Sequence, residues 1–144
     1  MTLLIDASPI VSLTEKTEPR RHLVQEVLRG YRGRLVIPAP VTAEIDYLIE
    51  ARNGIGANLG FLDDLAAGRF EVECLLPAEY GVVAALQRRY AALSPGLADL
   101  SIVVLAQRFN TRRVLTFDAR HFRAMAPPQG GQFEILPERR EPEA

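Results

Sequence analysis

The sequence predicts an α/β fold in which a mostly parallel sheet of four to five strands is covered by helices on both faces. Short apolar segments of strand type alternate along the chain with longer segments of helical periodicity. Strands that are separated by helices require crossover connections, and these place neighbouring strands parallel. The 144 residues, of which 48% are apolar, suffice for one domain with its own core.

The individual elements follow from periodicity and from the residues that break it. Strands are predicted at residues 2–5, 35–37, 70–75, 114–117 and 133–136, the last of them at an edge of the sheet. Ser8 is predicted to cap a helix that begins at Pro9. Further helices are predicted around residues 20–30 and over residues 41–52, 55–67, 78–93, 97–109 and 120–125.

The domain organisation is expected to be simple. Residues 1–136 are predicted to form a single domain, and residues 137–144 a charged, frayed C-terminal tail. Internal repeats and a second domain are not apparent in the sequence.

Composition restricts the class of protein. The formal net charge of −1 argues against wholesale electrostatic binding of nucleic acid, although arginines can still meet phosphates locally. Lys16 is the only lysine among 17 basic residues. The single cysteine, Cys74, is expected to be a buried thiol in a reducing compartment. Without a secretory signal or a long apolar run, a cytoplasmic protein with no membrane contact is expected.

Four acidic residues stand where a parallel sheet places its ligand site. Asp6 and Asp118 directly follow the first and fourth predicted strands. Glu44 lies in the first turns of the helix after the second strand, and Asp99 in the first turn of the apolar helix. Ligands of open parallel sheets bind beyond the carboxyl ends of the strands, so the fold gathers the four acids at one edge.

The surroundings of these acids favour a metal site. Asp6 and Asp99 border strongly apolar segments, and no lysine or histidine is expected beside them to pair with their charge. Carboxylates that converge without cations either raise their pKa values or bind a metal ion. An all-oxygen ligand set suits Mg²⁺ or Mn²⁺ rather than zinc.

Each acid taken alone has a plainer explanation. Asp6 and Asp118 fit ordinary turns at strand ends, and Asp99 fits the favourable end of a helix dipole. Glu44 alone fits a solvated helix face. The inference therefore depends on the joint arrangement. Asp46, two residues from Glu44 on the same helix, is expected on the opposite face. His121 is expected in a surface or packing role.

Four motifs carry a resemblance to a known family. They are 3–8 (LLIDAS), 42–44 (TAE), 97–102 (LADLSI) and 115–122 (LTFDARHF). In order and spacing they resemble those of the PIN-domain nucleases, and more closely the VapC-type toxins of bacterial toxin–antitoxin pairs. The resemblance covers almost the whole chain and implies a three-layer α/β/α sandwich of PIN type.

The resemblance also implies residue roles and partners. The family's metal-binding and catalytic acids carry over to Asp6, Glu44, Asp99 and Asp118, and its supporting hydroxyls to Ser8 and Thr116. The implied activity is endoribonucleolytic hydrolysis of RNA with Mg²⁺ or Mn²⁺ at the acids, leaving a 5′-phosphate. The implied partners are an RNA substrate, a VapB-like antitoxin and a second copy of the chain in a homodimer. The basic residues that flank the last motif are candidates for RNA contact: Arg112, Arg113 and Arg120.

Two alternatives remain open at this point. The chain could be a protein-binding module of the same fold, or a housekeeping RNA-processing nuclease that is not a toxin. Two other phosphotransfer folds fail at required residues. A haloacid-dehalogenase phosphatase needs a second acid where this chain has Ser8, and a receiver domain needs a late lysine, whereas Lys16 is early.

Overall fold

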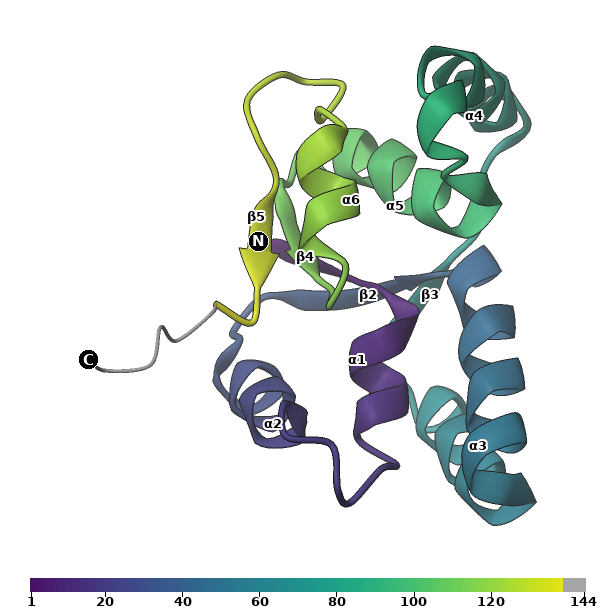
Figure 1. Cartoon of the computed structure of the whole chain (residues 1–144), viewed down its shortest axis with the longest axis vertical. Coiled ribbons are helices and arrows are strands. Elements are labelled where there is room, and N and C mark those ends of the chain that lie inside the picture. Colours follow the sequence, from purple (N-terminus) through teal and green to yellow (C-terminus); the bar gives the residue numbers. More distant parts are fainter. Residues whose placement is uncertain (139–144) are drawn as a thin grey trace.

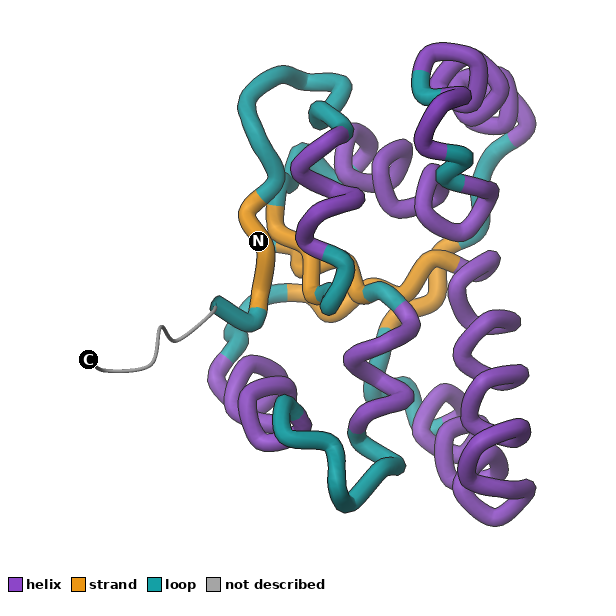
Figure 2. Tube along the Cα trace, viewed as in Figure 1, coloured by secondary structure: helices purple, strands orange, loops and turns teal. Residues whose placement is uncertain are grey.

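The five predicted strands all form, and they join one parallel sheet. The computed structural model of the protein describes residues 1–138. Figure 2 shows the strands together in the middle of the molecule, with helices on either side. The order across the sheet is β3-β2-β1-β4-β5, and every neighbouring pair is parallel. The strands are β1 (Thr2–Ile5), β2 (Arg34–Pro38), β3 (Glu71–Glu73), β4 (Arg113–Leu115) and β5 (Glu134–Leu136).

The order of the strands creates a switch point beside β1. The chain leaves β1 for β2 and β3 on one side, then crosses back to place β4 on the other side. Leu4 of β1 is in register with Val36 of β2 and with Val114 of β4. In open parallel sheets, the crevice at the carboxyl ends of two strands whose connections diverge is the usual ligand site. Here it lies between β1 and β4.

Within residues 1–138, six helices cover the sheet in two layers. Figure 1 shows α1, α2 and α3 on one side of the sheet and α4, α5 and α6 on the other. This arrangement confirms the predicted α/β/α sandwich. The helices are α1 (Ala7–Ser12), α2 (Arg21–Gly30), α3 (Ala39–Ala66), α4 (Pro77–Arg89), α5 (Gly96–Arg108) and α6 (Ala119–Ala124), with a 3₁₀ turn at Ala91–Leu93.

The core is formed by the central strand and by the most apolar helix. Every residue of β1 is buried, because helices pack on both faces and strands on both edges. Residues 100–106 of α5 are likewise all buried. Burial of aliphatic side chains contributes roughly 1.5–3 kcal/mol per residue. Both elements lead directly to predicted site residues, Asp6 after β1 and Asp99 before residues 100–106, so the core fixes their backbones.

The helix α3 is kinked where the sequence predicts a break. Gly54 has φ 84° and ψ 176° inside the helix, a conformation that is nearly restricted to glycine. Side-chain hydrogen bonds flank the kink. The Asn53 amide donates to Thr14 Oγ1 at 2.8 Å, and the buried Asn58 amide donates to the Asp46 carboxylate.

Two predictions about β3 and α4 were wrong in detail. Cys74 is exposed rather than buried, because β3 is an edge strand that ends at Glu73 and leaves Cys74 in the following connection. The helix predicted over 78–93 ends at Arg89 and is followed by the 3₁₀ turn. The proposed tail at 137–144 falls mostly outside the described residues. Within residues 1–138, no helix has the length and apolar character to cross a membrane.

Candidate functional site

The four predicted acids are delivered to the carboxyl edge of the sheet by four separate elements. Asp6 follows β1 and Asp118 follows β4 by three residues. Glu44 lies near the start of α3, directly after β2, and Asp99 lies in the first turn of α5. Their charges act on one another, because Asp6, Glu44 and Asp118 each raise the pKa of Asp99. The sheet has therefore gathered these four acids into one electrostatic cluster.

Asp6 is held by a buried threonine across the switch point. Thr116 Oγ1 donates a hydrogen bond to Asp6 Oδ2 at 2.7 Å, and both residues are buried. The same oxygen of Thr116 accepts from the backbone N–H of Asp118 at 3.0 Å. One hydroxyl thus links the turn after β4 to the acid after β1. The structure thus brings Thr116 and Asp6 into contact, and the role of Thr116 as a supporting hydroxyl stays a prediction.

Asp6, and not Ser8, caps helix α1. Asp6 has extended backbone geometry and its Oδ1 accepts from the Ala7 N–H at 2.8 Å. Ser8 is already inside the helix, and it is exposed. The prediction of Ser8 as the cap was wrong because the helix begins directly after the strand, without an intervening turn. Ser8 lies two residues after Asp6, and its side chain is exposed to solvent.

Burial and mutual repulsion make the acids reluctant to ionise together. The pKa of Asp99 is raised from 3.8 to about 7, chiefly by burial and then by the charge on Asp6. Burial also raises the pKa of Asp6, while the hydrogen bond from Thr116 lowers it. The pKa of Glu44 is raised by desolvation and by Asp6. Such shifts toward neutrality mark a site that lacks positive charge.

The basic side chain that lies nearest the acids belongs to a histidine rather than to a lysine or an arginine. Within residues 1–138 no lysine or arginine forms an ion pair with any of the four acids. His121 Nε2 lies 3.6 Å from Asp99 Oδ2, and its Nδ1 lies 3.5 Å from Asp118 Oδ2. The expectation that no histidine stands beside the acids was wrong. Its spacing of three residues from Asp118 in a helical segment was the signal that could have indicated it.

The donor set suits a hard divalent cation, although the side chains are not yet gathered around one point. Among the described residues, no three histidine, cysteine, aspartate or glutamate side chains lie close enough to hold a metal ion. Asp6 and Asp99 are mostly buried, whereas Glu44 and Asp118 are exposed and have room to turn. Oxygen donors with raised pKa values are the chemistry that Mg²⁺ or Mn²⁺ would stabilise.

The three arginines predicted to contact RNA do not lie together. Arg113 begins β4 and therefore lies at the end of that strand away from Asp118; it donates to Glu134. Arg112 precedes it and donates to the carbonyl of Gly130. Only Arg120, exposed in the first turn of α6, is on the side of the acids.

A further arginine lies at the rim of the site. The guanidinium of Arg20, in the connection between α1 and α2, stacks 3.9 Å from the ring centroid of Phe117. Phe117 stands between Thr116 and Asp118 in the chain. Arg20 also pairs with Glu18 at 2.8 Å and is half-exposed. No local feature of the sequence distinguishes Arg20 from the other exposed arginines.

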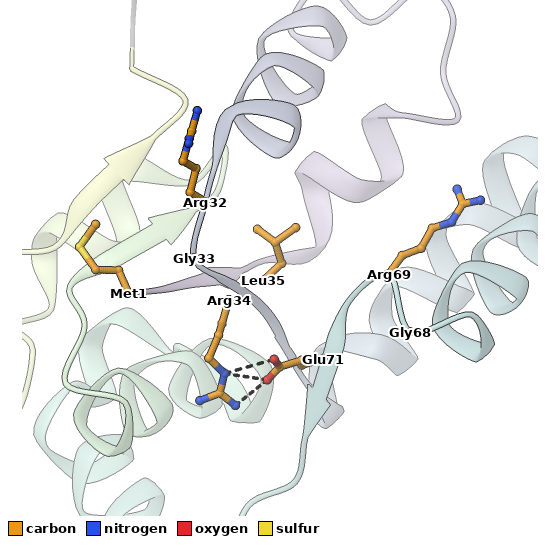
Figure 3. Close-up of a pocket in the computed structure, with 8 residues that line it drawn as sticks. All are labelled: Met1, Arg32, Gly33, Arg34, Leu35, Gly68, Arg69 and Glu71. Carbon is orange, nitrogen blue, oxygen red and sulfur yellow. Dashed lines mark hydrogen bonds and ion pairs between the residues drawn. The ribbon is translucent and has the colours of Figure 1, made fainter.

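A separate pocket lies at the opposite edge of the sheet. It has a volume of about 510 Å³ and is lined by residues that precede or begin β1, β2 and β3 (Figure 3). In this pocket Arg34 donates to Glu71, as the dashed lines in Figure 3 mark. Because parallel strands present their amino ends at one edge and their carboxyl ends at the other, this pocket is distinct from the acidic cluster.

Comparison with known proteins gives one consistent family. A model of the PIN domain matches residues 3–127. Ribonuclease VapC26 from Mycobacterium tuberculosis is 37% identical over 135 residues, which is 94% of this chain and 100% of that relative. The crystal structure of VapC20 from Mycobacterium tuberculosis, described as a sarcin-ricin loop cleaving toxin, superposes with a TM-score of 0.75. That match covers 83% of this chain and 92% of the other at 13% identity, so it bears on the fold alone.

Proposed function

The chain belongs to the PIN domain family, and from this premise we propose that it is an RNA-cleaving endonuclease, the toxin of a toxin–antitoxin pair. The proposal assigns Asp6, Glu44, Asp99 and Asp118 to a site for Mg²⁺ or Mn²⁺. The observation that carries it is the electrostatic cluster of four acids at the switch point, in which the pKa of Asp99 reaches about 7. Ribonuclease VapC26, similar over its full length, supports RNA as the substrate.

The burial of each acid would decide its part in binding the metal ion. Asp6 and Asp99 have backbones fixed by the core and would form the rigid half of the site. Glu44 and Asp118 are exposed and would complete it when a cation arrives. Thr116 orients one oxygen of Asp6, which leaves the carboxylate with a defined direction toward the cation. Ser8, exposed beside Asp6, would orient water.

A divalent cation bound there would supply an activated water and neutralise the charge that develops on the phosphodiester. The chain's own part is to hold the scissile phosphate within reach despite four carboxylates. Without the cation, the acids would repel an RNA phosphate, so the same residues that bind metal also make RNA binding depend on it.

Arginines at the rim would position the RNA. Arg20, stacked on Phe117, and Arg120 are exposed cationic groups on the side of the acids. Neither forms an ion pair with the four acids, so both guanidinium groups are available to contact a flanking phosphate. Arginine forms bidentate contacts with phosphate, which suits this role.

An exposed apolar stripe on α3 would be covered by a second copy of the chain. Ile55, Leu59 and Leu62 follow the Gly54 kink at helical spacing and are 66%, 52% and 42% exposed. Contiguous apolar side chains of this kind mark interaction surfaces. We expect a homodimer by light scattering, and a monomer for Leu59→Lys.

The antitoxin, by contrast, would place a cationic side chain among the four acids.

Cleavage by the purified chain, compared with Asp99→Asn, tests the proposed function. Wild-type protein is expected to cut RNA with Mg²⁺ or Mn²⁺, to stop with EDTA and to recover when Mn²⁺ is added. Asp99→Asn keeps the shape of the side chain and is expected to be inactive while folded. Activity equal to wild type in that variant would refute the scheme. Binding of a partner without any metal-dependent cleavage would favour the protein-binding alternative.

A further inference from the structure

His121 lies beside the four acids, but the proposed metal site gives it no role. It is the third residue of α6, and its backbone N–H donates to Asp118 Oδ1 at 3.3 Å, which closes the cap of that helix. Its imidazole lies beside Asp99 and Asp118. Its side chain is only 21% exposed. A histidine in a purely surface role would instead point its ring into solvent.

The imidazole spans two acids that belong to different elements. Its Nε2 faces Asp99 of α5 at 3.6 Å, and its Nδ1 faces Asp118, the cap of α6, at 3.5 Å. Within the described part of the chain, Nε2 is buried and has no hydrogen-bond partner. A buried polar atom of this kind costs free energy unless a small movement gives it a partner. Asp99 Oδ2 lies 3.6 Å from Nε2, a few tenths of an ångström beyond the usual hydrogen-bond distance.

We propose that His121 is a positioning residue, whose ring N–H holds one oxygen of Asp99 and thereby directs the other toward the metal ion. The inference rests on the proposed metal site and adds a residue to it. Thr116 would do for Asp6 what His121 does for Asp99. Asp6 already accepts from Thr116 at Oδ2 and from the Ala7 N–H at Oδ1, and each oxygen keeps a lone pair for the cation. Asp99 would gain the corresponding side-chain donor from His121. Hydrogen-bonded partners of this kind typically alter metal affinity by about 10–100-fold.

Two substitutions at His121 test whether its N–H donor or the size of its ring is what matters. His121→Phe keeps a ring of similar size but removes the N–H. His121→Gln removes the ring but can place an amide N–H near the position of Nε2. We expect Mn²⁺ affinity, measured by calorimetry on the folded protein without RNA, to fall about 10–100-fold in His121→Phe. His121→Gln is expected to restore most of the loss. His22→Phe, on the exposed side of α2, is the matched control and should bind Mn²⁺ like wild type.

The two histidines of the chain provide a spectroscopic readout. On addition of Mg²⁺, the ring nitrogen signals of His121 should shift in ¹⁵N spectra, while those of His22 stay unchanged. If wild type binds no Mn²⁺, the proposed metal site fails and this inference with it. If wild type binds Mn²⁺ and His121→Phe binds it equally well or more tightly, only the role of His121 is overturned. Recovery by His121→Phe but not by His121→Gln would show a packing role instead.

Discussion

Thr116 and Asp6 are 110 residues apart in the chain, yet the hydroxyl of Thr116 lies 2.7 Å from the carboxylate of Asp6, and both residues are buried just beyond the paired ends of β4 and β1. The backbone reinforces this contact, since the Asp6 N–H donates to the carbonyl of Leu115 at 2.9 Å. The hydrogen bond favours the charged form of Asp6, against the burial that raises its pKa. Together with the Ala7 N–H, Thr116 therefore favours ionisation of the buried carboxylate that we propose as a metal ligand.

Thr116→Val should weaken both metal binding and the fold. The valine keeps the shape but removes the donor to Asp6, so the pKa of Asp6 should rise further and its ionised form become scarcer. We expect Mn²⁺ affinity to fall about 10–100-fold, measured by calorimetry at pH 7. Unfolding should become easier by roughly 1–3 kcal/mol in denaturant titration.

Thr111→Val is the matched control for that experiment. Thr111 is also buried, and its hydroxyl donates to the carbonyl of Thr2 at 2.6 Å, before β4 begins and at the opposite edge of the sheet. The control should lose about 1 kcal/mol of stability and retain the affinity of wild type for Mn²⁺. Equal losses of affinity in both variants would mean that the effect of Thr116 is general destabilisation.

The metal-free protein should lose stability as pH rises from about 4 to about 7. Folding raises the pKa of Asp99 from 3.8 to about 7, and it raises those of Asp6 and Glu44 in the same direction. In this window the folded state binds more protons than the unfolded state, so unfolding becomes easier as the pH increases. Thermal melts in EDTA should show a falling Tm, and Mg²⁺ should restore it at pH 7 and above.

Asp99→Asn tests how much of this pH dependence of stability comes from Asp99 rather than from other titrating groups. The variant cannot ionise at position 99, so its Tm should change less with pH and exceed that of wild type at pH 8 in EDTA. The pKa values of Glu18, Glu71 and Glu79 are lowered by arginine partners from a usual value of 4.5, so these groups oppose the trend mainly at the acid end of the window. A wild-type Tm that rises between pH 5 and pH 7 would contradict the assignment.

Gly54→Ala and Gly56→Ala should have opposite effects on stability. Neither added methyl group would meet another atom within 4 Å, so the backbone decides the outcome. Gly54 has φ 84° at the kink of α3, where an L side chain is strained, and its replacement should cost about 1–3 kcal/mol. Gly56 is helical, and its replacement should stabilise by about 0.4–1 kcal/mol. Denaturant titration measures both, and an unaffected Gly54→Ala would contradict the kinked geometry.

Arg20→Ala and Arg120→Ala should weaken RNA binding in a salt-dependent way. The Asp99→Asn background is used because it is expected to bind RNA without cutting it. For binding of a single-stranded RNA, each lost phosphate contact should reduce the slope of log binding constant against log salt concentration by about 0.7. Fluorescence anisotropy at several salt concentrations in Mg²⁺ measures this slope. Arg69→Ala is the control, because Arg69 lines the pocket at the other edge of the sheet. An equal change in the control would assign the effect to net charge alone.

The sequence alone was enough to predict the α/β class and the elements that matter most. The apolar segments predicted the bounds of β1 and the strong burial of α5, and the Asn53-Gly54 pair predicted the break in α3. These features are local, because burial patterns and turn-forming residues are visible in short stretches of sequence. The positions of Asp6 and Asp118 after strands predicted their convergence, because parallel strands share one ligand-binding edge.

Only the tertiary structure decided which groups touch. The contact of Thr116 with Asp6, the bridge of His121 between Asp99 and Asp118 and the stack of Arg20 on Phe117 depend on strand order, which no local pattern contains. The same order left β3 at an edge and Cys74 exposed. The sequence predicted that the four acids share one end of the sheet because each lies at or near the end of an element, and their role as metal ligands stays a prediction. It could not determine their partners, because those come from elements that meet only after the sheet has formed.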